Sequence, residues 1–201
     1  MSEISEARFR KTISEMDAAN EQDPHQELVN GKPIPKELIY GIRMSEMLIE
    51  TYPDAQECLR LAARAQHIQR WTIPRTDYPM DRKGYLRWRT RLKQFHGELA
   101  GNIMKDNGYS ELEIRKVEDL LNKRRLKTDP EVQALEDVVC LVFLKYYFQD
   151  FIQKHLDETH KLIGILQKTW NKMSEKGQQK ALAMSHPEPV KRLLAAALGE
   201  T

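Results

Sequence analysis

Apolar residues recur at spacings of three and four along most of the chain, which is the pattern of amphipathic helices. No stretch alternates with a period of two for long enough to predict a strand. The expected helices cover residues 3–19, 35–51, 54–71, 82–107, 111–121, 130–148, 162–170 and 189–198, with a further short helix before Ser185. The sequence therefore predicts an all-α protein of about eight helices.

Local signals mark several of the expected helix ends. Pro74 cannot continue a helix, because its ring blocks the preceding turn and its nitrogen carries no proton. Gly108 is a typical C-terminal residue, and Ser110 followed by Glu113 is a capping box. Asp129 followed by Pro130 combines a cap with a first-turn proline. Residues 30–35, rich in proline and glycine, are expected to form a loop.

Length and composition limit the architecture. The chain has 201 residues, 40% of them hydrophobic, and contains no internal repeat or linker, so we expect a single helical domain over residues 1–201. Its two cysteines suggest a reducing compartment. The longest apolar run, Val138–Leu144, is far shorter than the ~20 residues of a membrane helix. With no basic, apolar start, the sequence predicts a soluble, cytoplasmic protein.

Charge is balanced overall but not locally. The chain carries 32 basic and 30 acidic residues, which gives no general argument for nucleic acid or membrane as a partner. Between Arg60 and Lys93, however, ten lysines and arginines face only two aspartates, a net charge of +8. This segment is either a solvated helix surface or an anion-binding surface.

Three ionisable residues fall on or next to apolar stripes of separate helices: His67, His96 and Asp137. Burying such groups costs free energy unless they are paired or bind something. Imidazole nitrogens and a carboxylate oxygen also suit a divalent metal ion, and helices of one bundle can direct all three to one point. The alternative is that both histidines are core residues, hydrogen-bonded to Asp137, Glu136 or the backbone.

Several cationic residues are spaced to lie beside these histidines. Arg70 follows His67 by one turn, and Arg89 and Lys93 precede His96 by two turns and one. Guanidinium groups match phosphate oxygens in a bidentate manner. We therefore expect the following residues to bind a phosphate-bearing small molecule: Arg70, Arg75, Tyr78, Arg89 and Lys93. Asn20, Asp23, Tyr40 and Arg43 either line this pocket or serve as caps and surface residues.

The order His67, His96 and Asp137 on helices resembles the HD-domain superfamily of metal-dependent phosphohydrolases, over roughly residues 55–150. The resemblance implies an all-α, HD-like core with the terminal helices packed on it, and a divalent ion (Mn, Fe, Ni, Co or Mg) held by His67, His96 and Asp137. In this pattern an aspartate follows the second histidine, whereas this chain has Gly97.

A closer resemblance covers nearly the whole chain. Its motifs are Ala-Arg-Ala-Gln-His67-Ile-Gln-Arg70-Trp71, Pro74-Arg75-x-x-Tyr78-Pro79-Met80, Gly84-Tyr85-Leu-Arg-Trp88-Arg89 and Leu135-Glu136-Asp137-x-x-Cys140. They look like an uncharacterised helical domain family, some of whose members carry the label glutamyl-tRNA synthetase. The chain lacks the nucleotide-binding strand–loop–helix that such a synthetase needs, so this likeness indicates membership and not activity.

The leading hypothesis is a metal-dependent phosphohydrolase acting on a phosphorylated small molecule or nucleotide. A metal-bound water would be the nucleophile, with Glu136 or Glu98 as the base. The alternative, which Gly97 favours, is a non-enzymatic binding or scaffold protein that keeps a degenerate HD-like pocket. A membrane partner is not expected, and nucleic acid is disfavoured by the nearly neutral charge.

Overall fold

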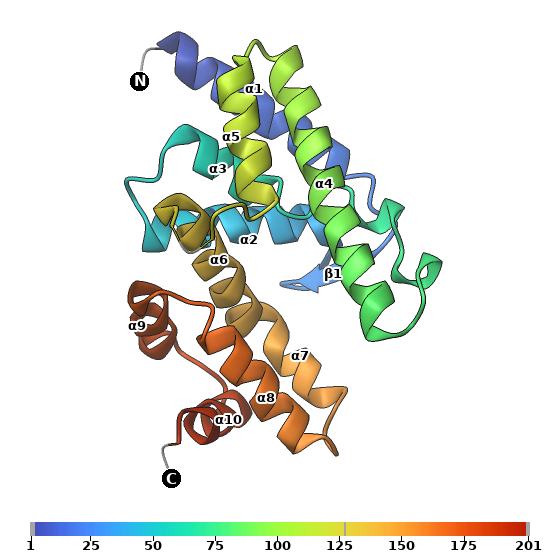
Figure 1. The fold of residues 1–201 in the computed structure, drawn as a ribbon, viewed down its shortest axis with the longest axis vertical. Coiled ribbons are helices and arrows are strands. Elements are labelled where there is room, and N and C mark those ends of the chain that lie inside the picture. Colours follow the sequence, from blue (N-terminus) through green and yellow to red (C-terminus); the bar gives the residue numbers. More distant parts are fainter. Residues whose placement is uncertain (1–2, 127, 200–201) are drawn as a thin grey trace.

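The computed structural model describes residues 3–126 and 128–199. These residues are mostly helical, with ten α-helices and a two-stranded hairpin (Figure 1). The α-helices are α1 (Glu3–Asn20), α2 (Lys36–Thr51), α3 (Glu57–Arg64), α4 (Arg82–Asp106), α5 (Glu111–Leu121), α6 (Pro130–Val142), α7 (Phe148–Gln153), α8 (Thr159–Trp170), α9 (Glu175–Ala183) and α10 (Glu188–Leu198). The remaining elements are strands β1 (Gln26–Val29) and β2 (Lys32–Pro35), the 3₁₀-helices η1 (Arg70–Thr72) and η2 (Arg75–Asp77), and the π-helix η3 (Phe143–Tyr147).

The helices form two groups joined by one long helical element. Helices α1 to α5 gather at one end of the molecule, α8 to α10 lie at the other, and α6 with its continuation into η3 and α7 runs between them (Figure 1). One cluster of buried apolar side chains extends through both groups, from Phe9 to Leu194. Helix α6 supplies the fully buried side chains of Leu135, Val138 and Leu141 to it.

Several predicted helix ends are confirmed. The Asp81 carboxylate accepts a hydrogen bond from the Gly84 amide at 2.6 Å and so caps α4. Ser110 and Glu113 form the predicted capping box of α5. Asp129 accepts from two amides at the start of α6, where Pro130 occupies the first turn. These ends depend on residues within four positions of one another, which is why the sequence predicts them.

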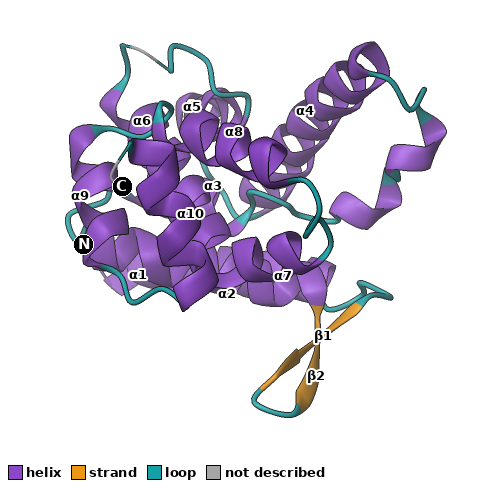
Figure 2. Cartoon of the chain, turned by 90° about the horizontal axis from the view of Figure 1, so that it is seen from below, coloured by secondary structure: helices purple, strands orange, loops and turns teal. Residues whose placement is uncertain are grey.

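The expected loop at residues 30–35 is instead part of a hairpin that projects from the helical body (Figure 2). Val29 pairs with Lys32 across a two-residue turn, in which Asn30 and Gly31 have φ angles of +51° and +78°. Asn-Gly is the preferred sequence for this type of turn, because both positions need a positive φ. The signal was therefore present in the sequence, and the all-α prediction is corrected to mostly helical.

The helix expected to run to Trp71 ends at Arg64. The chain then makes turns through residues 65–69 before η1 begins, and Gln69 adopts a left-handed conformation with φ +48°. The side chain of Asn20, at the end of α1, accepts a hydrogen bond from the Gln69 amide at 2.9 Å. His67 consequently lies on a turn. The spacing of apolar residues had predicted that it lies on a helix.

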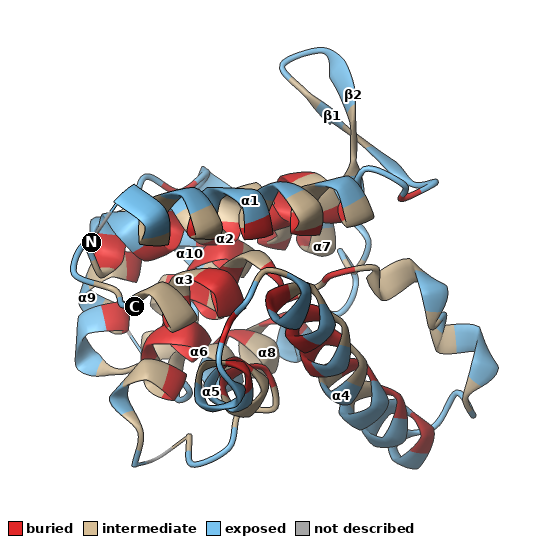
Figure 3. Cartoon of the chain, turned by 90° about the horizontal axis from the view of Figure 1, so that it is seen from above, coloured by how far each residue is buried: buried red, intermediate tan, exposed pale blue. Residues whose placement is uncertain are grey.

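Helix α4 is in contact with α5 along its C-terminal half, and its N-terminal half continues beyond α5 (Figures 1 and 3). A β-carbon at Gly97 would lie 3.2 Å from Asn122 Nδ2, and one at Gly101 would lie 3.0 Å from Glu118 Oε1. The two glycines therefore permit this close approach, and an aspartate in place of Gly97 would require the Asn122 side chain to shift. None of the helices in the described part of the chain is both long and apolar enough to cross a membrane.

Candidate functional site

A small polar pocket lies where the turn after α3, the helix α4 and the α5–α6 connection meet. Its lining residues are Gln66, His67, Arg70, Arg89, Leu92, Lys93, His96 and Lys123. The hollow measures about 20 Å³, which is room for about one water molecule. A larger ligand group therefore requires the long cationic side chains at its edge to move outward.

His67 is held in place on two sides. Its ring stacks on Tyr40 of α2 with centroids 3.9 Å apart and planes 10° from parallel. Its Nδ1 lies 3.2 Å from Oε2 of Glu37, a buried residue in the first turn of α2. Burial is the largest cause that lowers the pKa of His67 well below its usual value of 6.5, and the cations Arg70 and Arg89 lower it further. The ring is therefore neutral at physiological pH.

Glu37 is fixed by residues from the end of α1 and the segment that follows. The Asp23 carboxylate accepts from the Glu37 amide at 3.0 Å, and the Asn20 amide group donates to the Glu37 carbonyl oxygen at 3.3 Å. Burial raises the pKa of the Glu37 carboxyl, while Arg70 opposes this shift from 3.8 Å. Asn20 thus supports both the left-handed turn at Gln69 and the partner of His67.

His96 enters the pocket from α4. Its ring centroid lies 6.0 Å from that of His67, and its Nδ1 donates to the carbonyl oxygen of Ile68 at 2.9 Å. Burial, followed by the neighbouring His67, lowers the pKa of His96 to about 3. The two histidines therefore lie close together, as predicted. The hydrogen bond from His96 to the Ile68 backbone is of the kind expected if the histidines are core residues.

Four cations surround the two rings. Arg70 packs over Trp88, with its guanidinium carbon 5.1 Å from the ring centroid, and Arg89 and Lys93 lie one turn apart on α4. Lys123 reaches the pocket from a left-handed backbone position with φ +56°. Burial lowers the pKa of Lys93, and the charges of Lys123 and Arg89 add to that effect. Such crowding of like charges favours an anion in the pocket.

Asp137 is not part of this pocket. It lies on α6 and is fully buried. Its carboxylate accepts hydrogen bonds from the hydroxyls of Tyr52 and Ser174, the Ser174 amide and the Gln133 side chain. A β-carbon at Gly177 would lie 2.7 Å from the Asp137 carboxyl carbon, so α9 packs directly on it. No group of three or more histidine, cysteine, aspartate or glutamate side chains that could hold a metal ion occurs among residues 3–126 and 128–199.

The other predicted site residues divide into two sets. Glu136 is buried and pairs with Lys123, and also lies 3.8 Å from Lys172. It therefore borders the pocket as the partner of one of its cations. Arg75 instead donates to the carbonyl oxygens of Tyr78 and Asp81, so Arg75 and Tyr78 stabilise the loop before α4.

Glu98 is exposed and pairs with Arg91. None of Arg75, Tyr78 and Glu98 is among the lining residues of the pocket.

Sequence reasoning missed Glu37, Gln66 and Lys123. Glu37 precedes Tyr40 and Met44 by three and seven residues, so it shares their buried stripe, and a glutamate on such a stripe was a usable signal. Lys123 lies in the connection between α5 and α6, where its backbone is left-handed and no periodic pattern predicts where its side chain lies. Nothing local distinguishes Gln66 from a surface glutamine.

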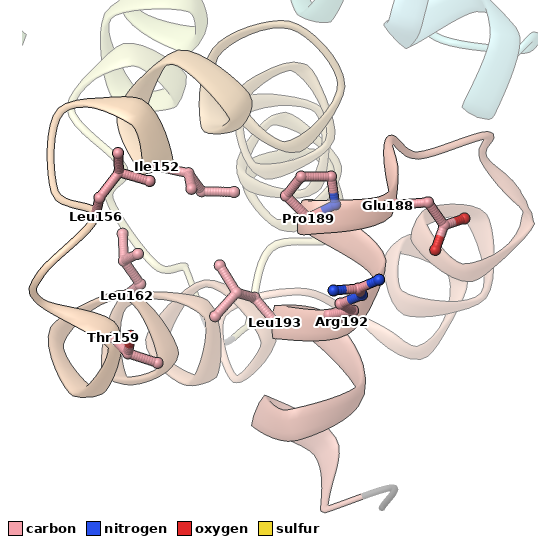
Figure 4. Close-up of a pocket in the computed structure, with 8 residues that line it drawn as sticks. All are labelled: Ile152, Leu156, Thr159, Leu162, Glu188, Pro189, Arg192 and Leu193. Atoms are coloured by element: carbon pink, nitrogen blue, oxygen red, sulfur yellow. The ribbon is translucent and has the colours of Figure 1, made fainter.

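A larger hollow, of about 370 Å³, lies between α7, α8 and α10 (Figure 4). Its walls are mostly apolar, formed by residues such as Ile152, Leu156 and Leu193, with Glu188 and Arg192 at one edge (Figure 4). It contains no pair of ionisable groups held in a fixed geometry. The smaller pocket is therefore the better candidate for binding chemistry.

Fold and site together define a mostly helical protein with a cation-lined pocket beside two neutral imidazoles. The chain belongs to the family described as Domain of unknown function (DUF4202), whose sequence profile matches residues 10–194. Membership of a family without an assigned activity was predicted, and the match shows no link to the HD-domain superfamily. No curated protein matches the chain, and no solved structure matches it.

Proposed function

We propose that this protein binds a small molecule bearing a phosphate group, with the phosphate in the pocket between His67 and Lys123. The observation that carries the proposal is the convergence of four partly buried cations on one small pocket. Lys123 pairs with Glu136 and Arg70 lies 3.8 Å from Glu37, whereas Arg89 and Lys93 make no ion pair within the described residues. Phosphate oxygens match guanidinium and ammonium donors, and binding would relieve the repulsion between the cations.

Each cation has a distinct position around the phosphate. Arg70 is oriented by its packing on Trp88, while Arg89 and Lys93 are supported by the rigid turns of α4. Lys123 would exchange part of its interaction with Glu136 for the ligand. Because the hollow is small, we expect Arg89 and Lys93 to swing outward as the phosphate enters.

Thermal unfolding with increasing inorganic phosphate tests the proposal, because a ligand that binds only the folded state raises Tm in a saturable manner. We expect saturable stabilisation of the wild type that potassium chloride does not reproduce. Lys93→Met should abolish it, whereas Lys83→Met, which removes an exposed lysine of the same helix, should not. Equal responses of the two variants would contradict the proposal.

Hydrolysis of the bound phosphate ester is a second proposal, supported by the two neutral rings beside the cations. Metal-dependent hydrolysis of the HD type fits the donor set poorly, since Asp137 is committed to Tyr52, Ser174 and Gln133 and the four cations would repel a divalent ion. A phosphatase screen on wild type and His67→Ala, without added metal and with Mn, Co, Ni or Mg, tests hydrolysis, and equal background rates in the two proteins would contradict it.

A further inference from the structure

The pocket contains hydrogen-bond acceptors as well as cations. Gln66 is only 6% exposed, its side chain lines the pocket, and its Oε1 is buried without a hydrogen-bond partner. A buried amide oxygen without a donor is costly, and the O–H or N–H group of a ligand or a water molecule can supply the missing donor. The four cations do not satisfy it in this structure.

The His96 imidazole presents a second acceptor. The Ile68 carbonyl oxygen can only accept a hydrogen bond, so His96 Nδ1 carries its proton. A neutral ring has one nitrogen-bound proton, and His96 Nε2 is therefore an unprotonated acceptor. Within residues 3–126 and 128–199, this Nε2 has no hydrogen-bond partner. His67 Nδ1 lies 3.2 Å from Glu37 Oε2 without hydrogen-bond geometry, so this contact does not assign the proton of the second ring.

These acceptors restrict which anion satisfies the pocket. We propose that the ligand presents an oxyanion together with an O–H donor, as hydrogen phosphate or a hydroxyl-bearing phosphate ester does. The negative charge meets the four cations, and the O–H group meets Gln66 Oε1 or His96 Nε2. Sulfate has nearly the same size and charge but carries no proton, so it leaves both acceptors unsatisfied. This inference rests on the proposed function and names the ligand chemistry of the same site.

Calorimetric titration with matched dianions tests the inference. At about pH 8, hydrogen phosphate, methyl phosphate and sulfate are all mainly dianions, and only hydrogen phosphate carries an O–H group. We expect the wild type to bind hydrogen phosphate with a Kd about tenfold lower than that for sulfate, the effect of one hydrogen bond to a charged ligand. Glycerol 3-phosphate, a dianion with hydroxyls on its carbon chain, shows whether the donor can come from the rest of the ligand.

Two variants separate the acceptors. Gln66→Met keeps the length of the side chain but removes the acceptor, and should lower the preference for phosphate over sulfate by about threefold or more. Gln94→Met makes the same change on the exposed face of α4 and should leave the preference unchanged. His96→Asn can keep the donor to Ile68 while removing the Nε2 acceptor, so it provides a second test independent of how the Gln66 amide is oriented.

The outcomes distinguish this inference from the proposal on which it rests. A wild type that binds no anion would refute the proposed function itself. A wild type that binds sulfate as tightly as hydrogen phosphate, with glycerol 3-phosphate no better, would refute only the O–H requirement. An unchanged preference in both Gln66→Met and His96→Asn would also overturn it. A higher affinity for hydrogen phosphate or glycerol 3-phosphate, reduced in either variant, supports it.

Discussion

Two buried polar centres lie on this scaffold, and they differ in how completely they are satisfied. Around Asp137, neutral donors from α6, the residue after α2 and the start of α9 converge on one carboxylate. Around His67 and His96, four cations share a hollow, Gln66 has an unpartnered oxygen, and two non-glycine residues, Gln69 and Lys123, are left-handed. Both centres are polar and enclosed. Only at the Asp137 centre do groups of the protein itself satisfy the hydrogen-bonding capacity of the buried polar atoms.

The difference indicates which centre has a structural role and which has a binding role. A buried carboxylate with several donors stabilises the fold, and here it fixes the C-terminal helices to α6. A centre with repelling charges, an unpaired acceptor and left-handed backbone costs free energy, and such features cluster where a protein binds or transforms a ligand. Among the sequence candidates, Asp137 therefore belongs to the scaffold and the histidines to the site.

The largest expected effect is on stability at the first centre. Asp137→Ala removes the fully buried acceptor shared by the partly buried donors of Tyr52, Gln133 and Ser174 and leaves a cavity, which should lower the free energy of unfolding by about 3–5 kcal/mol. Urea unfolding measures this loss. Asp150→Ala, at an exposed position, should stay within about 0.5 kcal/mol of wild type. A similar small loss at Asp137 would contradict its structural role.

The next effect is the acid sensitivity of the pocket. The pKa values of His67 and His96 are lowered in the folded state, so the unfolded chain takes up protons near pH 6.5 while the folded protein does not. Stability should therefore fall as pH drops below 6.5, by roughly 1.4 kcal/mol per pH unit for each histidine.

The loss from His96 should continue toward its folded pKa of about 3. Urea unfolding at a series of pH values checks this dependence. His96→Asn should remove the contribution of one ring to the slope between pH 6.5 and 5.5. An unchanged slope would show that His96 titrates alike in both states.

A smaller effect of opposite sign is expected from a pocket cation. Lys93→Met removes one of several repelling charges, so it should raise the free energy of unfolding in the absence of ligand, by about 0.5–1 kcal/mol. Chemical denaturation in a buffer without phosphate measures the change, with Lys83→Met as the control at an exposed site. Destabilisation by Lys93→Met would indicate that this lysine serves the fold, as Asp137 does.

The smallest effect concerns Glu98, which was a candidate base. It is exposed and pairs only with Arg91 on the outer face of α4. Glu98→Gln should change stability by less than about 0.5 kcal/mol and leave phosphate binding unchanged. Parallel thermal unfolding and calorimetry check both. A loss of phosphate binding in this variant would show that the pocket extends to the opposite side of the helix.

Much of the fold could be predicted because its signals are local. The caps at Asp81, Ser110 and Asp129 lie within a few residues of the helices they start, and all three are present. The signal for the hairpin, Asn30-Gly31, is also local, although the high proline and glycine content of residues 30–35 favours a loop. The end of α3 was not predictable, since it depends on Asn20 of a distant helix.

The site was predicted in part for the same reason. The helical spacing of Arg89, Lys93 and His96 is a local property, and these residues do share the pocket. The roles of Asp137 and Glu37 depend on Ser174, Tyr52 and Asp23, which lie 14 or more positions away in sequence. A carboxylate on an apolar helix face looks the same whether its partners are a metal ion or neutral donors.

The most direct test of the binding claim is a crystal structure of the wild-type protein soaked in phosphate. We expect a tetrahedral anion between His67 and His96, in contact with Arg89 and Lys93, with Asp137 still hydrogen-bonded to Ser174. Phosphate at another place alone, or at no place while the pocket cations keep their positions, would contradict it.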